Sequence, residues 1–228
     1  MYKQYSLNEA NVRVDNILNM NLSNLDTVEI LPTNEDLRTQ TVRKAFASVI
    51  CVKFKIKIND EIKRLKIQRL IASEFYNILN SHEGIYNISI LNDTFIALYN
   101  TPRKGDIDNL IGIAAKLNSI TQYFNFCVGT EAVDIKIAIH YSPISICRLG
   151  QTDDVNNGIC YLGDSVSHTF KIVNDVFDNS NDVIFITDVI FKNLKNEYKV
   201  FFEKLDNDIY STTISNNLIS NWIDKTKK

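Results

Sequence analysis

One segment of this chain alternates between apolar and polar residues with the period of a β-strand. Its apolar side chains occupy every second position, namely Ile50, Val52, Phe54, Ile56 and Ile58. The positions between them hold Cys51, Lys53, Lys55 and Lys57. Successive side chains of a strand point to opposite faces of a sheet, so the pattern predicts a strand from about Ser48 with one apolar face. The chain therefore has to fold around a sheet whose apolar face packs against other elements.

Helical and strand-like segments alternate along the rest of the chain. The predicted helices cover about residues 6–20, 60–82, 106–124 and 164–177, a segment that begins at Asp188, and a short segment around Trp222. The predicted strands cover about residues 48–58, 85–91, 94–99, 133–140, 144–149, 159–162, 183–187, 198–205 and 209–214. Two strand pairs are predicted as hairpins, with turns at Asn92–Asp93 and at Tyr141–Pro143. This order predicts an α+β fold in which helices pack on a mainly antiparallel sheet.

The chain is predicted to form one domain behind an N-terminal extension. Ser6 and Glu9 have the spacing of a capping box, which favours a first helix, whereas residues 21–40 are polar, contain Pro32 and show no sustained period. Residues 1–40 are therefore interpreted as a helix and a connecting arm able to wrap a partner subunit. Residues 41–228 are interpreted as a single domain, large enough to fold without disulfides or a structural metal.

Charge and cysteine content restrict the partners and the compartment. The chain holds 25 Lys and Arg against 27 Asp and Glu, so no overall field attracts nucleic acid or an anionic membrane. The four cysteines are widely separated and form no Cys-x-x-Cys pair, which is typical of reduced thiols: Cys51, Cys127, Cys147 and Cys160. No apolar run approaches the roughly 20 residues that cross a bilayer, and the first residues form no apolar signal core. We expect a cytoplasmic protein.

The most informative stretch for function runs from Ile159 to Lys171. A short apolar strand enters Leu162-Gly163-Asp164 and continues directly into a helix. Backbone N–H groups at such a helix start can bind an anion, so Gly163 and Asp164 are candidate nucleotide-binding residues. A capped helix start without any ligand explains the same residues equally well.

In spacing and flanking pattern, this stretch resembles the Leu-Gly-Asp-x-Val-Asn-x-x-x-Arg motif of the class III nucleotidyl cyclases. The element order is similar to their catalytic domain from about Ser48 to Ile214, and the layout is most similar to the short bacterial pyrimidine cyclases of the Pycsar antiphage systems. The resemblance implies a ferredoxin-like core. It also implies an active site formed between two subunits, in which a ribose 3′-oxygen is joined to an α-phosphate with release of pyrophosphate. Active members need magnesium or manganese ions held by two aspartates.

Several positions of this chain depart from the family pattern. The catalytic Asn and Arg of the family fall on Ser167 and Lys171, and the first metal-binding Asp falls on Lys53. The second falls on Asp93, in the turn of the first hairpin. Because an ammonium group repels a divalent cation, we expect no cofactor, or Mg²⁺ or Mn²⁺ if the chain is active.

The positions that the family uses near the base fall on Ser89 and Cys160. Neither side chain carries the charge usual at these positions, so the preferred base stays open. Lys53 is also a candidate phosphate ligand, although lysines on one strand face are commonly just solvated.

Bland explanations compete with several of these functional interpretations. Asp93 is common in a hairpin turn for backbone reasons, and Lys171 is equally explained as a solvated helix residue. The three histidines, His82, His140 and His168, show no ligand spacing and are interpreted as surface or core residues.

The resemblance and the substitutions together predict a catalytically impaired cyclase homologue, a pseudo-cyclase that acts through dimerisation, nucleotide binding or both. Its expected setting is bacterial cyclic-nucleotide signalling or antiphage defence, as a homodimer or as a heterodimer with a cyclase-like subunit. One alternative is a divergent active cyclase that makes a cyclic mononucleotide such as cCMP or cUMP. Another is a sensor that captures a nucleotide in the old cleft with Lys53 and Lys171.

Overall fold

The protein is built around one long, twisted sheet. The computed structural model describes residues 6–19, 27–33, 36–39, 42–128, 132–148, 158–206 and 208–226. Seven strands lie side by side in the order β3 (Ile85–Leu91), β4 (Thr94–Tyr99), β2 (Val42–Ile56), β5 (Val133–Arg148), β7 (Ile184–Thr187), β9 (Ile209–Thr212) and β8 (Glu203–Asp206). The short strand β1 (Thr27–Val28) pairs with β2, and the short strand β6 (Ile159–Leu162) pairs with β5. Only the β1–β2 and β5–β7 pairs among these are parallel, which confirms the mainly antiparallel sheet.

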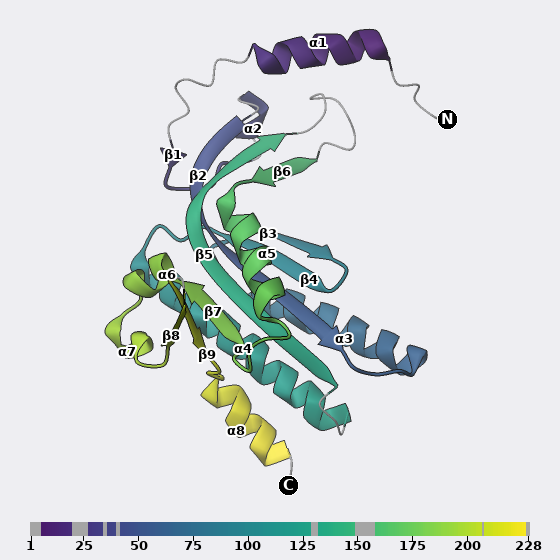
Figure 1. The fold of residues 1–228 in the computed structure, drawn as a ribbon, viewed down its shortest axis with the longest axis vertical. Coiled ribbons are helices and arrows are strands. Elements are labelled where there is room, and N and C mark those ends of the chain that lie inside the picture. Colours follow the sequence, from purple (N-terminus) through teal and green to yellow (C-terminus); the bar gives the residue numbers. More distant parts are fainter. Residues whose placement is uncertain are drawn as a thin grey trace.

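Helices cover both faces of the centre of the sheet (Figure 1). The described helices are α1 (Leu7–Leu18), α2 (Asp36–Thr39), α3 (Glu61–Leu79), α4 (Lys104–Val128), α5 (Asp164–Val176), α6 (Asp188–Asn193), α7 (Asn196–Lys199) and α8 (Asn217–Thr226). On one face, α3 and α4 enclose the largest core, where Phe75 and Leu110 meet Ile50 and Val52 of β2. On the other face, α5 packs Ile172 and Val173 against the sheet. This arrangement confirms the predicted α+β fold with helices packed on the sheet.

The alternating segment forms the central part of β2, as its pattern predicts, but the strand begins at Val42, six residues before the expected start. Both of its faces are covered in the middle, because Cys51 is buried under α5 while Val52 is buried under α3 and α4. The lysines emerge only at the far end, where Lys53 is partly exposed and Lys55 is exposed.

The second hairpin was predicted wrongly, because β5 is one continuous strand of 16 residues. It pairs with β2 without interruption from Val133 opposite Ile56 to Cys147 opposite Val42, so Pro143 lies within the strand opposite Phe46. On its other edge β5 pairs with β7 at residues 137–139 and with β6 at residues 145–148, and residues 141–143 lie between these two pairings. Proline removes no ladder hydrogen bond where a strand edge is unpaired, so the turn-like residues are tolerated there.

Other element boundaries also differ from the prediction. The long helix α4 begins at Lys104 rather than at Asp106, whose carboxylate instead accepts a hydrogen bond from the Arg103 N–H at 2.9 Å. The cap of α6 is Thr187 rather than Asp188. The segment predicted as a strand from Tyr198 starts with α7, and β8 begins only at Glu203.

The N-terminal arm packs on the sheet, whereas the helix before it does not. Leu31 and Leu37 are buried in a small core with residues of β2, β4 and β5, and the Leu31 N–H donates to Asn100 Oδ1 at 2.7 Å. The Tyr86 hydroxyl donates to the Pro32 carbonyl at 2.8 Å. In α1, Ser6 Oγ caps the Glu9 N–H at 3.3 Å as predicted, but none of its residues is buried and the helix lies apart from the sheet (Figure 1). None of the described helices combines the length and apolarity required to cross a membrane.

Candidate functional site

The junction between β6 and α5 is held tightly against β5. Gly163 adopts a φ of 148°, and a Cβ atom there would lie 3.1 Å from the Pro143 carbonyl oxygen and 3.2 Å from Ile144 Cα. The buried Ser165 side chain, two residues later, hydrogen-bonds to the Ser142 hydroxyl. The first turn of α5 is therefore positioned by a glycine that permits close approach and by a serine pair that fixes it.

A shallow cavity of about 400 Å³ opens at this junction, lined by His140, Asp164, Ser167, His168 and Lys171. The structure thus brings together three of the residues that the sequence singled out: Asp164, Ser167 and Lys171. The Ser167 hydroxyl lies 3.3 Å from the Asp164 carbonyl and 3.4 Å from the Gly163 carbonyl, so its proton is directed back into the helix. Ser167 therefore offers a ligand mainly an acceptor, while Lys171 offers an exposed cation.

Two histidines complete the cavity, and the sequence interpretation missed their proximity. The rings of His140 on β5 and His168 on α5 have centroids 5.0 Å apart, and His140 Nδ1 hydrogen-bonds to Thr187 Oγ1 at 2.8 Å. The pKa of His140 is lowered to about 4, mainly by burial and also by the neighbouring His168, while Asp164 partly opposes the shift. His140 is therefore neutral at neutral pH.

Two sequence signals could have found this histidine pair. His168 lies four residues after Asp164 and three before Lys171, which places all three on one face of a helix. His140 lies on the same face of β5 as Ala138 and Ser142, and both of these residues contact α5.

The same helix face continues toward the lysines of β2. Ser167, Lys171, Asn174 and Asp178 follow one another at intervals of four, three and four residues, which is the spacing of one helical stripe. The Lys53 ammonium donates a hydrogen bond to Asn174 Oδ1. Lys55 forms an ion pair with Asp178 at 3.3 Å.

The Phe177 ring lies beneath both ammonium groups, with its centroid 5.7 Å from Lys53 Nζ and 6.0 Å from Lys55 Nζ. Lys53 is therefore engaged by the end of α5 within its own chain. It is a contact of the fold as well as a candidate ligand.

Lys53 and Asp93, the residues at which the resemblance leads us to expect metal ligands, do not fit a pair of divalent ions. Asp93 follows Asn92, which has a φ of 54°, and its carboxylate accepts a hydrogen bond from Thr94 Oγ1 at 2.9 Å. Its carbonyl accepts the Phe54 N–H at 2.9 Å, so Asp93 lies beside Lys53. One carboxylate next to an ammonium group is a poor donor set for Mg²⁺ or Mn²⁺. Within the described ranges, no group of three or more His, Cys, Asp and Glu side chains is arranged to hold a metal ion.

The two positions expected near the base face different partners within the chain. The Ser89 hydroxyl is exposed on β3 and donates to Asn87 Oδ1 at 3.0 Å. Cys160 lies on β6 directly opposite Cys147 of β5. Between these regions, the rings of Tyr86 and Tyr161 meet edge to face at 6.1 Å.

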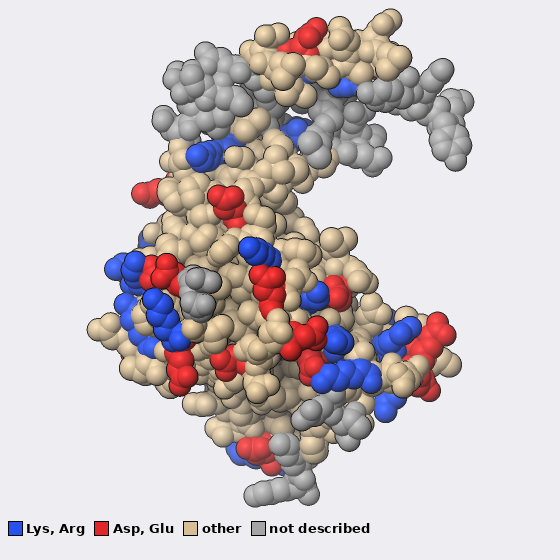
Figure 2. All heavy atoms as spheres, viewed as in Figure 1, with Lys and Arg blue, Asp and Glu red and all other residues tan. Residues whose placement is uncertain are grey.

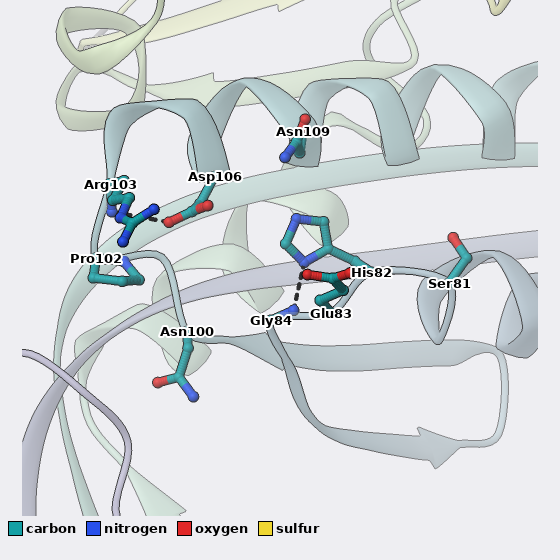
Figure 3. A pocket seen from close by; sticks show the side chains of 9 residues that line it. All are labelled: Ser81, His82, Glu83, Gly84, Asn100, Pro102, Arg103, Asp106 and Asn109. Atoms are coloured by element: carbon teal, nitrogen blue, oxygen red, sulfur yellow. Dashed lines mark hydrogen bonds between the residues drawn. The ribbon is translucent and has the colours of Figure 1, made fainter.

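A second cavity of about 460 Å³ lies at the N-terminal end of α4 (Figure 3) and contains none of the family-like positions. Its His82 Nδ1 accepts the Gly84 N–H at 2.8 Å, and the ring meets Tyr99 edge to face. A Cβ atom on Gly84 would lie 2.6 Å from the Asn100 carbonyl oxygen, so the backbone segments around Gly84 and Asn100 pack closely and require glycine. Acidic and basic side chains are interspersed on the face shown in Figure 2, with no patch of one sign.

The fold is that of known cyclases. No protein-family model matches the chain. A curated uridylate cyclase from Treponema porcinum is 22% identical over 235 residues, covering 97% of this chain and 82% of that protein. Among solved structures, the adenylyl cyclase CyaB from Pseudomonas aeruginosa superposes with a TM-score of 0.61 at 11% identity, over 77% of this chain and 97% of that one.

A class III adenylyl cyclase-like ATP-binding protein from Pseudomonas aeruginosa superposes with a TM-score of 0.60 at 16% identity, over 96% of this chain and 49% of that one. Together with the strand order, these similarities show that the chain has the fold of a class III nucleotidyl cyclase domain.

Proposed function

We propose that this chain is a pseudo-cyclase that acts through dimerisation and nucleotide binding rather than through metal-dependent catalysis. The observation that carries the proposal is the position of Lys53, which replaces a metal-binding Asp and is bound to Asn174 beside Asp93. Phosphoryl transfer of the family type depends on cations that neutralise the phosphates, and carboxylates must hold those cations. Asp93 alone leaves that requirement unmet in this chain.

The cavity at the β6–α5 junction is suited to a phosphate-bearing ligand. Lys171 supplies a cation, His168 a further donor, and the first turn of α5 supplies free backbone N–H groups. The cyclase-like protein from Pseudomonas aeruginosa with a similar fold is described as ATP-binding, which supports nucleotide binding as a use of this fold.

We further propose that the functional unit is a dimer, because the family forms its active sites between two subunits. The partner is either a second copy or a cyclase-like subunit that supplies the missing aspartates. In a mixed dimer this chain would contribute Ser167 and Lys171 from α5. The proposed setting is bacterial cyclic-nucleotide signalling or antiphage defence of the Pycsar type.

The decisive experiment incubates the purified chain with each of the four nucleoside triphosphates and manganese and measures cyclic mononucleotides by mass spectrometry. We expect no product from the wild type. The variant Lys53→Asp is expected to gain manganese affinity, seen as a rise in melting temperature with the metal, because two carboxylates then face each other at the site. Lys53→Asn, which removes the ammonium without adding a carboxylate, is the matched control and should gain none.

A second candidate function, a divergent active cyclase, is favoured by the uridylate cyclase relative. That function predicts cUMP or another cyclic mononucleotide from the wild type, and loss of product in Asp93→Ala. Product that persists in Asp93→Ala would argue against both functions, since it would come from chemistry elsewhere.

A nucleotide sensor without turnover is distinguished by thermal shift. We expect a nucleoside triphosphate to raise the melting temperature of the wild type. The melting temperature of Lys171→Ala should not change when the same nucleotide is added. A melting temperature that no nucleotide changes at saturating concentration would leave dimerisation as the only supported activity.

A further inference from the structure

Two of the four cysteines, distant in sequence, are brought together by the β5–β6 pair. Cys147 and Cys160 are directly opposite each other in the antiparallel register, and both side chains are half-buried. The Cys160 thiol is within hydrogen-bonding reach of Cys147, and burial together with this neighbour raises the pKa of the Cys147 thiol. Of the other two cysteines, Cys51 is buried in the core and Cys127 is exposed at the surface.

The backbone geometry at this pair suits a covalent link. Opposed residues of antiparallel strands have Cα atoms about 4.5–5.5 Å apart, and disulfides span Cα separations of roughly 4.4–6.8 Å. We propose that Cys147 and Cys160 form a reversible cross-strand disulfide that fixes β6 against β5 and stiffens the β6–α5 junction. The site is a modification site for a low-molecular-weight disulfide such as oxidised glutathione.

The chemistry balances as two thiol–disulfide exchanges. One protein thiolate attacks the glutathione disulfide and releases one glutathione thiolate, which leaves a mixed disulfide on the protein. The opposite thiolate then attacks the protein sulfur and releases the second glutathione. The protein loses two protons and two electrons, and the glutathione disulfide takes up both and is reduced to two thiols.

The link would act on the residues that line the candidate cavity. Cys160 is three residues before Gly163, and α5 begins immediately afterwards with Asp164, Ser167 and Lys171. Since β6 is a four-residue strand paired with β5, a covalent bond there restrains the start of α5 directly. An effect on nucleotide binding rests on the proposed function, whereas disulfide formation does not.

The test uses the full chain carrying Cys127→Ser, which removes the exposed thiol that would form intermolecular disulfides. The protein is treated with oxidised glutathione, alkylated under denaturing conditions and digested with trypsin. Trypsin cleaves after Arg148, between the two cysteines, so the disulfide joins two peptides that are otherwise separate. We expect this linked pair, its loss on reduction, and its absence in Cys147→Ser and in Cys160→Ser.

Glutathione attached to Cys147 or Cys160 without the linked peptide would overturn the proposal, as would full alkylation of both thiols after oxidant treatment. Hydrogen exchange of residues 159–167 is measured on both forms, and equal exchange would overturn the stiffening. Nucleotide thermal shifts are then compared between the oxidised and reduced forms. A disulfide that forms while neither form binds nucleotide would refute the nucleotide-binding part of the proposed function and leave the modification site standing.

Discussion

The Lys53 ammonium on β2 donates a hydrogen bond to Asn174 Oδ1 near the end of α5. This contact joins the central strand of the sheet to the helix that carries Ser167 and Lys171. The lysine therefore ties α5 to the sheet. The Lys53 ammonium also lies over the Phe177 ring, so an aromatic face and the Asn174 oxygen both hold the ammonium in place.

Removing the Lys53 ammonium is expected to destabilise the fold more than removing the neighbouring one. Lys53→Met keeps the apolar stem but loses the hydrogen bond to Asn174 and the contact with Phe177, which we expect to lower the free energy of unfolding by about 1 kcal/mol. Lys55→Met loses a longer contact with Phe177 and an ion pair with Asp178 between side chains 56% and 78% exposed, and should change it by less than about 0.5 kcal/mol. Urea unfolding of both variants measures the difference. Equal effects would show that the Lys53 contact contributes nothing beyond a surface charge.

The β6–α5 junction is expected to tolerate no side chain at Gly163. Gly163→Ala forces a Cβ atom to within 3.1 Å of the Pro143 carbonyl at a φ that L-residues rarely adopt. We expect a loss of roughly 1–3 kcal/mol in the free energy of unfolding and weaker nucleotide binding. The control is Gly112→Ala in α4, where a Cβ atom meets nothing within 4 Å and the helix should gain about 0.5–1 kcal/mol. A stable Gly163→Ala variant would mean that β6 and α5 are not seated against β5 as described.

The stability of the fold should decline in mild acid because of His140. Its pKa in the folded protein, about 4, lies below the ordinary value of 6.5, so the unfolded chain binds a proton first as the pH falls. The stability is fully present above about pH 6.5 and is lost as the pH falls toward 4. The groups that face His140 are His168, Asp164 and Thr187, and the partial exposure of the ring reduces the expected loss to about 1–2 kcal/mol.

The measurement is the free energy of unfolding as a function of pH for the wild type and His140→Gln. The variant should show a smaller decline between pH 6.5 and 4 because glutamine does not titrate. Parallel curves for the two proteins would assign the acid sensitivity to other groups.

The sequence was sufficient for elements whose pattern and turn chemistry agree. Strands β3 and β4 have the predicted bounds because two apolar runs flank a two-residue turn, and Asn92 adopts the left-handed conformation that such a turn requires. The hairpin expected at Tyr141–Pro143 failed because local turn signals there are outweighed by pairing with β2 along the whole of β5. Local preference is a weak guide where a long partner strand fixes the register.

The candidate site was predictable in part for the same reason. Asp164, Ser167 and Lys171 share a helix face, so their common cavity follows from spacing alone. The contributions of His140 and of Cys147 depend on which strands lie beneath and beside that helix, and such long-range pairing carries no local signal. The partner of Lys53 was hidden likewise, because Asn174 lies 121 residues away.

Packing of the N-terminal arm on the sheet is expected to contribute to stability, although α1 is not. Leu37 is only 1% exposed, in a core with Leu31 and Ile144, so Leu37→Ala should lower the free energy of unfolding by about 2–3 kcal/mol through lost burial and a cavity. Leu18 is 76% exposed on α1, so Leu18→Ala should leave stability within about 0.5 kcal/mol. Both variants replace leucine by alanine, so chemical denaturation compares the two positions for the same loss of side-chain atoms. If Leu37→Ala were as mild as Leu18→Ala, the arm would not be part of the folded core, and its attachment to Asn100 and Tyr86 would have to form only with a partner subunit.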